Sequence, residues 1–162
     1  MDYCSGGDLS FHLKREKSFQ EPKARAYLAE IVLALEELHA HDIIYRDLKP
    51  DNIVLDGSGH VMLTDFGLSK QGIKNHRHTY SFCGSVAYLP PEILNKQGHG
   101  KAVDWYLAGT LLYEMLVGYP PYYAKSKDAI FSNIRSAPLP FPHTMGKQAK
   151  NLISQLMIRD PA

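Results

Sequence analysis

The amino-acid sequence predicts a mainly helical α+β domain, and three patterns support this fold class. After Pro22, a residue suited to the first turn of a helix, apolar residues recur on one helical face until about His41. Of the three short apolar runs at 43–45, 53–55 and 61–63, the last two are typical of strands. The stretch 105–117 is apolar on nearly every face, which is typical of a helix buried in the middle of a fold.

Turn-forming residues mark where these elements end. The segment Asp-Gly-Ser-Gly-His at 56–60 separates the last two short apolar runs and predicts a β-hairpin. Gly118 and the prolines that follow it end the central helix. Two more helices are expected near 128–135 and 146–158. Residues 67–92 are polar and irregular, and a loop of this length in a compact domain indicates a function.

Length and composition exclude several classes of protein. The 162 residues suffice for one domain with a sizeable core. A net charge of +1 gives no basic field for nucleic acid or a membrane surface. The start of the chain lacks signal-peptide features, and the stretch 105–117 is too short for a transmembrane segment. Cys4 and Cys83 lie far apart, which fits free thiols and a cytoplasmic or nuclear location.

Most of the candidate catalytic residues lie in the eight-residue run Tyr-Arg-Asp-Leu-Lys-Pro-Asp-Asn at 45–52. Asp47, Lys49 and Asn52 share one short loop, so their side chains can converge on one point. Asp65 follows the expected hairpin, which returns the chain to the same place. An acid, a cation and two potential metal ligands are the groups that transfer of a phosphoryl group from a nucleotide requires.

Together with Asp-Phe-Gly at 65–67, this run resembles the signature of the protein kinases. Chance resemblance, with the run acting only as a solvated turn, is a poor explanation for two motifs at the right spacing. The resemblance covers essentially all 162 residues and is closest to the AGC group of serine/threonine kinases. It implies a protein-kinase-like fold, large C-terminal lobe only, with a hinge at 1–7, a catalytic loop at 45–52, an activation segment at 65–92 and the central and following helices at 104–160.

The resemblance implies ATP and Mg²⁺ as cofactors and assigns roles to the motif residues. Asp47 matches the catalytic base of the family, and Lys49 matches the cation that contacts the γ-phosphate. Asn52 and Asp65 match the ligands of Mg²⁺, which prefers hard oxygen donors. Lys49 is also typical of kinases whose protein substrates offer a Ser or Thr hydroxyl.

The hinge implies the position of the adenine. Met1 matches the gatekeeper, and the backbones of Asp2 and Cys4 match the adenine contacts of the family. Leu9 and Val54 match the apolar floor under the base, which an adenine pocket requires. Taken singly, a Met, a Val and a Leu are more often ordinary core residues. Only their register with the catalytic loop points to a nucleotide site.

Peptide recognition is also implied. Asp8, Asp51 and Glu114 match acids that receive arginines N-terminal to the acceptor in basophilic AGC kinases. An equally good interpretation of Asp8 is a cap on the helix that begins near Leu9. Ser85 matches the hydroxyl residue that ties the substrate-binding loop to the catalytic Asp and Lys. Its plain alternative is a loop serine in solvent.

Ser81 matches the activation-loop phosphosite of AGC kinases, which implies an upstream activating kinase as a partner. Arg46 and Lys70 match the cations that receive the phosphate. Thr79 is the alternative site. Without phosphate, we expect residues 68–85 to be loosely held because they contain few apolar anchors.

Five further residues match structural positions of the family. Tyr45 replaces the usual His of the catalytic loop, as in other AGC kinases, and Phe66 and Gly67 complete the metal-binding motif. Glu92 matches the acid that closes the activation segment. Asp104 matches a buried acid at the start of the central helix that hydrogen-bonds the catalytic-loop backbone.

The glycine-rich loop and strand lysine of a complete kinase precede the hinge, so we expect the N-terminal lobe to be absent and this chain alone to be inactive. Two other classes of function compete with an active protein kinase. A pseudokinase or docking module would not need Asp47, Lys49, Asn52 and Asp65 together. A small-molecule phosphotransferase would not need the long segment ending in Pro-Pro-Glu at 90–92, which docks a peptide in the family.

Overall fold

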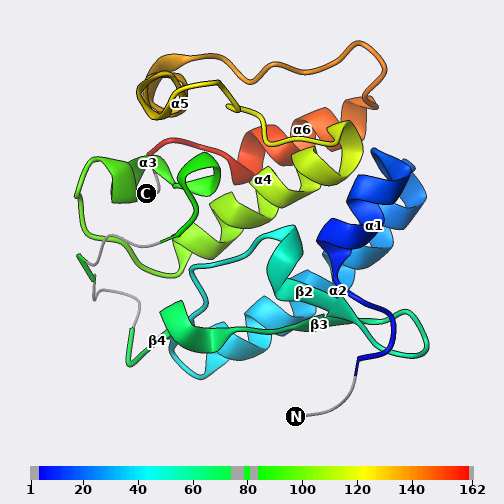
Figure 1. Cartoon of the computed structure of the whole chain (residues 1–162). Helices are drawn as coiled ribbons and strands as arrows, with labels where there is room; N and C mark the ends of the chain where they lie inside the picture. The colour runs from blue at the N-terminus through cyan, green and yellow to red at the C-terminus, as the bar shows by residue number, and fades with distance from the viewer. Residues whose placement is uncertain (1–3, 74–78, 81–83, 161–162) are drawn as a thin grey trace.

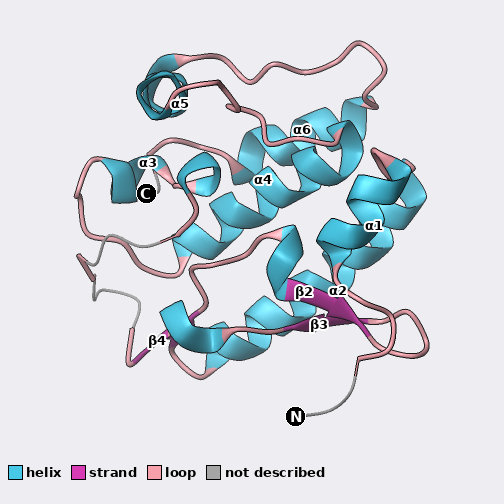
Figure 2. Cartoon of the chain, in the orientation of Figure 1, coloured by secondary structure: helices cyan, strands magenta, loops and turns pink. Residues whose placement is uncertain are grey.

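The structure is a computed structural model that describes residues 4–73, 79–80 and 84–160 (Figure 1). Its helices are α1 (Leu9–Glu16), α2 (Glu21–Ala40), α3 (Pro91–Leu94), α4 (Ala102–Val117), α5 (Lys127–Ser136) and α6 (Lys147–Leu156). Its strands are β1 (Ile43–Ile44), β2 (Ile53–Leu55), β3 (Val61–Leu63) and β4 (Lys70–Gln71). The predicted mainly helical α+β class is confirmed (Figure 2). Within the described ranges, no helix is both long and apolar enough to cross a membrane.

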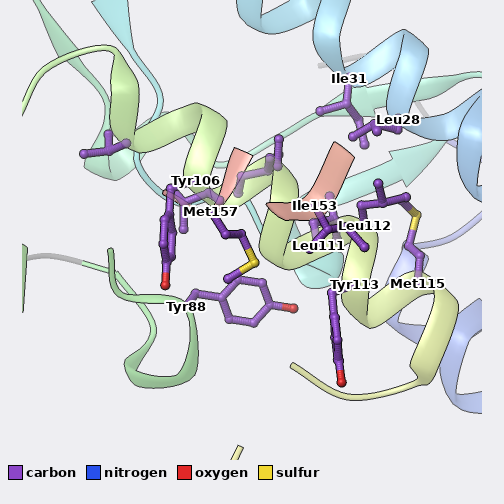
Figure 3. Packing of buried hydrophobic residues seen from close by; sticks show 14 of the residues in the cluster. Leu28, Ile31, Tyr88, Tyr106, Leu111, Leu112, Tyr113, Met115, Ile153 and Met157 are labelled. Atoms are coloured by element: carbon purple, nitrogen blue, oxygen red, sulfur yellow. The ribbon is translucent and has the colours of Figure 1, made fainter. Parts of the chain in front are cut away.

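Helix α4 lies at the centre of the domain, with α2 and α6 packed against it (Figure 1). This sixteen-residue helix includes the whole predicted stretch 105–117 and begins three residues earlier, at Ala102. Side chains from α2, α4 and α6 meet in the core cluster, part of which Figure 3 shows: Leu28, Ile31, Leu111, Leu112, Met115, Ile153 and Met157. Because this packing surrounds α4, the polar residues at its two ends have fixed positions.

The predicted hairpin is present. Strands β2 and β3 pair antiparallel, with Ile53 opposite Leu63. The Asp56 carboxylate shapes the turn by accepting hydrogen bonds from the backbone N–H groups of Ser58 (2.8 Å) and His60 (2.9 Å). The hairpin therefore returns the chain from Asn52 to the same end of the domain.

The segment expected to be irregular from residue 67 onward contains more structure than predicted. Strand β4 pairs antiparallel with β1, and α3 begins inside the segment. Ile73 is buried, and its N–H donates to the carbonyl of Asp42 at 3.0 Å. Thr79 and His99 exchange two backbone hydrogen bonds, of 2.9 and 3.0 Å. The described residues 68–73 and 79–80 therefore have defined backbone contacts and two buried side chains, Ile73 and Thr79.

Candidate active site

The Asp104 side chain, which is fully buried in the first turn of α4, holds the backbone of the catalytic loop. One carboxylate oxygen of Asp104 accepts hydrogen bonds from the N–H of Tyr45 (2.9 Å) and from Nε2 of His39 (2.8 Å). The other accepts from the N–H of Arg46 at 2.7 Å. Arg46 has a φ of 70°, a conformation that costs free energy and persists only where neighbours impose it. Asp104 therefore sets the backbone immediately before Asp47.

Asp47, Lys49 and Asn52 meet in one hydrogen-bonded cluster. The Asp47 carboxylate accepts from Nζ of Lys49 at 2.8 Å and from Nδ2 of Asn52 at 2.7 Å. The Asn52 amide also donates to the Asp47 carbonyl at 2.8 Å. Asp47 and Asn52 are each 6% exposed, so the carboxylate keeps one fixed orientation beside a cation. The convergence expected from the sequence is thus found.

Asp65 is brought beside this cluster by the hairpin. The N–H of Thr64, the residue before it, donates to the Asn52 carbonyl at 2.9 Å. Asp65 has a φ of 52°, and its carboxylate accepts from the N–H of Gly67 at 3.1 Å. Its side chain is exposed, whereas Asn52 is buried. The two predicted metal ligands therefore come from adjoining ends of β2 and β3.

These two residues fit a cation that is also bound by other ligands. No group of three or more His, Cys, Asp or Glu residues able to hold a metal occurs in the described part of the chain. Mg²⁺ binds through one or two protein side chains, with water and nucleotide phosphates as its remaining ligands. Asn52 and Asp65 supply oxygens of the required kind.

Tyr45 and Phe66 link the two halves of the site. Their rings meet edge to face with centroids 5.4 Å apart. The Tyr45 hydroxyl donates to the Thr64 carbonyl, next to Asp65. Burial raises the pKa of Tyr45, so this hydroxyl keeps its proton. Phe66 is 49% exposed, so one side of its ring faces away from the domain.

The nucleotide-binding predictions have different outcomes. Met1 and Asp2 lie outside the described residues. Cys4 and Val54 are both half-buried, which leaves part of each accessible. Leu9 is fully buried and belongs to the core cluster, so its plain interpretation as a core residue is the better one.

A pocket of about 430 Å³ lies beside the catalytic loop, and its lining includes the predicted substrate residues Asp51 and Glu114 together with Lys14 and Lys17. Oε2 of Glu114 is buried and has no hydrogen-bond partner among the described residues. Burial, and secondarily the charge of Asp51, raise the pKa of Glu114 to about 7. A cation that binds beside such a carboxylate stabilises its charged form.

Two other substrate predictions are not supported in the same way. Asp8 caps α1, because its carboxylate accepts from the N–H of Phe11 at 2.7 Å. The alternative interpretation of Asp8 as a helix cap is therefore confirmed. Ser85 precedes a 3₁₀ turn at 86–88, and within the described chain its side chain makes no hydrogen bond to Asp47 or Lys49.

The predicted phosphosite Ser81 lies outside the described residues, but both of its expected cation partners are described. The Arg46 guanidinium donates through Nε to the Leu68 carbonyl at 2.7 Å, and its buried Nη1 has no partner among the described residues. Lys70 donates to the hydroxyl of Thr79 at 2.7 Å. Thr79 is only 3% exposed, so the alternative phosphosite is closed to solvent.

Glu92 lies in the first turn of α3 and is 4% exposed. Burial raises the pKa of its carboxyl group. This acid therefore has a buried structural position, as the sequence predicts.

The fold and the cluster around Asp47 define a kinase lobe, and comparison with known proteins agrees. The protein kinase domain family matches residues 1–162, so this chain belongs to the protein kinase family. Protein kinase 2 of Dictyostelium discoideum is 51% identical over 160 residues, which cover 99% of this chain and 33% of that protein.

Two other relatives agree with the predicted resemblance to AGC kinases. Serine/threonine-protein kinase Sgk1 of Homo sapiens is 47% identical over 99% of this chain and 37% of its own length. The RAC family serine/threonine-protein kinase homolog of Dictyostelium discoideum is 48% identical over 99% of this chain and 36% of its own length. The recognition of an AGC-type kinase sequence is confirmed. The chain spans about a third of the length of the curated relatives that it matches.

Proposed function

We propose that this chain is the large lobe of a longer serine/threonine kinase that transfers the γ-phosphate of ATP to protein hydroxyls. The observation that carries this proposal is the buried contact of the Asp47 carboxylate with both Lys49 and Asn52. The serine/threonine kinases among its relatives support the class of reaction. Since the chain spans about a third of those relatives, activity is assigned to the complete kinase.

The chemistry follows from the fixed positions of the side chains. The Asp47 carboxylate accepts the proton of a Ser or Thr hydroxyl while the hydroxyl oxygen forms a bond to the γ-phosphorus. The bond from that phosphorus to the bridging oxygen of ADP breaks at the same time. Lys49 stabilises the negative charge of the transferred group. Mg²⁺, which Asn52 and Asp65 would hold, neutralises the phosphate charges of the nucleotide when it is bound.

A pseudokinase or docking module is the second candidate. It would keep the fold and the pocket beside the catalytic loop but would have no use for a catalytic base. Transfer of radiolabelled phosphate from ATP to a basic peptide by the complete kinase separates the two functions. We expect transfer, whereas peptide binding without transfer would favour the docking module.

We also propose a preference for arginine N-terminal to the acceptor, supported by the pocket beside the catalytic loop. Asp51 and Glu114 present two carboxylates to one cavity, and a guanidinium can bind carboxylates through paired, directional hydrogen bonds. A peptide-library screen of the complete kinase should select arginine two or three residues before the acceptor. Selection of proline after the acceptor, or of acidic residues alone, would contradict this preference.

The 162-residue chain by itself should show no measurable transfer. It lacks the motifs that clamp the β- and γ-phosphates in complete kinases, and loss of one preorganised contact of this kind costs roughly 10²–10³ in rate. Robust phosphorylation of a peptide by the purified chain would disprove this expectation.

A further inference from the structure

The end of the expected hinge, just before α1, pairs with β2 (Figure 1). The N–H of Gly6 donates to the Leu55 carbonyl at 3.0 Å, and the N–H of Leu55 donates to the Gly7 carbonyl at 2.9 Å. Asp8 and Val54 form an antiparallel bridge. A side chain does not fit at Gly6, because a Cβ there would lie 2.6 Å from the Cβ of Leu55. The hinge backbone is therefore in close contact with the strand that carries Val54, the expected floor of the adenine site.

His12, the fourth residue of α1, holds the same backbone from the side of the helix. Its Nε2 lies 2.6 Å from the Gly6 carbonyl oxygen. A carbonyl oxygen only accepts hydrogen bonds, so Nε2 carries the hydrogen and donates it. Gly6 thus has its N–H bonded to β2 and its carbonyl bonded to α1. Both peptide groups of Gly6 are fixed in this way, two residues after Cys4, whose backbone is an expected adenine contact.

The orientation of the His12 ring is set by its neighbours on α1. Nη2 of Arg15 lies 3.3 Å from Nδ1 of His12. A guanidinium only donates hydrogen bonds, so Nδ1 is the acceptor, which is the tautomer that leaves the hydrogen on Nε2. The Phe11 ring meets the His12 ring edge to face, with centroids 5.5 Å apart. His12 therefore presents one defined donor to the hinge.

We propose that His12 is a positioning residue for the adenine of the nucleotide, because its hydrogen bond keeps the hinge against β2. The adenine would lie between the backbone near Cys4 and the side chain of Val54, so a shift of Gly6 away from β2 changes the shape of this site. His12 acts through Gly6 and takes no part in the transfer itself. The inference rests on the proposed use of ATP.

The test uses the complete kinase and four variants. His12→Leu removes the donor, His12→Gln places an amide donor near the position of Nε2, and His12→Asn carries the same amide on a shorter side chain. His41→Leu is the matched control, because Nδ1 of His41 also bonds a backbone carbonyl, that of Glu37 at 2.9 Å, but at the C-terminal end of α2.

Dissociation constants are measured for ATP and for adenosine, which has no phosphates. The peptide KM, kcat at saturating ATP and the midpoint of thermal unfolding are measured for the same proteins. His12→Leu and His12→Asn should raise the Kd of both ligands by the same factor, about three- to tenfold, the range expected for one hydrogen bond. The peptide KM and kcat should not change, His12→Gln should recover most of the affinity, and His41→Leu should bind both ligands like the unmodified kinase.

Unchanged Kd values in His12→Leu and His12→Asn, or a loss confined to ATP, would overturn the inference. So would equal losses in His12→Gln and His12→Asn, a comparison that still decides the matter if His12→Leu does not fold. A parallel rise in the peptide KM would show a general structural role instead and would also overturn it. Binding of adenosine without phosphate transfer by the unmodified kinase would refute the kinase function and leave the role of His12 intact, so the two failures are distinguishable.

Discussion

His39 and Asp104 are joined by a hydrogen bond of 2.8 Å between Nε2 and the carboxylate, although they lie 65 residues apart in sequence. His39 comes from the end of α2 and Asp104 from the start of α4. The edge of the Trp105 ring also meets His39, with ring centroids 5.2 Å apart. This contact holds the carboxylate that orients the backbone of Tyr45 and Arg46, so packing between two core helices determines the geometry of the catalytic loop.

Replacement of Asp104 by Ala should destabilise the 162-residue chain. The substitution removes the acceptor of two backbone N–H groups and one imidazole N–H, and each unsatisfied buried donor costs about 1–3 kcal/mol. We expect the free energy of unfolding in urea to fall by about 3 kcal/mol or more. Glu36→Ala, an exposed acid on α2, is the control. Equal stability of the two variants would show that Asp104 does not hold the loop.

Phosphorylation of Ser81 should activate the complete kinase. Arg46 has a buried nitrogen without a partner among the described residues, and phosphate binds arginine by charge-assisted hydrogen bonds. We expect Ser81→Ala to lower kcat/KM at least about tenfold, the scale of one to two kcal/mol of ordering. Thr79→Ala should have a smaller effect, since Thr79 is buried against Lys70. A fully active Ser81→Ala enzyme, with activity lost in Thr79→Ala, would move the switch to Thr79.

Glu114 should make the stability of the chain depend on pH. Its pKa in the folded chain is raised from 4.5 to about 7, chiefly by burial. The stabilisation by its protonated form is therefore complete below about pH 4.5 and is lost as the pH rises through about 7.

Glu114→Gln stays neutral throughout this range, so it should raise the midpoint of thermal unfolding above pH 7 and have little effect near pH 4.5. Glu36→Gln, at an exposed position, should have no such pH dependence. If Glu114→Gln were destabilising at high pH, the carboxylate would have a cationic partner in the folded chain.

Local patterns predicted the helices and the hairpin well, because each depends on residues close in sequence. Helix α2, expected from Pro22 to about His41, is observed at Glu21–Ala40. The pairing of β1 with β4 was missed because two-residue strands whose partners lie 26 and 28 residues apart leave no periodic pattern. The fold class was predictable because it depends on such local patterns, whereas the pairing of distant strands does not.

The same limit applies to the site. Asp47, Lys49 and Asn52 share one loop of six residues, so their convergence was predictable. His39 was missed because a lone histidine on a buried helix face gives no sign of a partner 65 residues away. The close approach of the Lys17 carbonyl to Gly118 was also missed, because only the folded chain brings these two residues together.

The central claim is that Asp47 accepts the proton of the acceptor hydroxyl, and Asp47→Asn in the complete kinase tests it most directly. The amide keeps the shape of the side chain and its contact with Asn52 but cannot take the proton, so kcat should fall by at least about 100-fold. Asp128→Asn, the same chemical change at an exposed position on α5, should leave kcat unchanged. Retention of more than about a tenth of kcat by Asp47→Asn would contradict the account, because general-base catalysis alone contributes roughly 10²–10⁴.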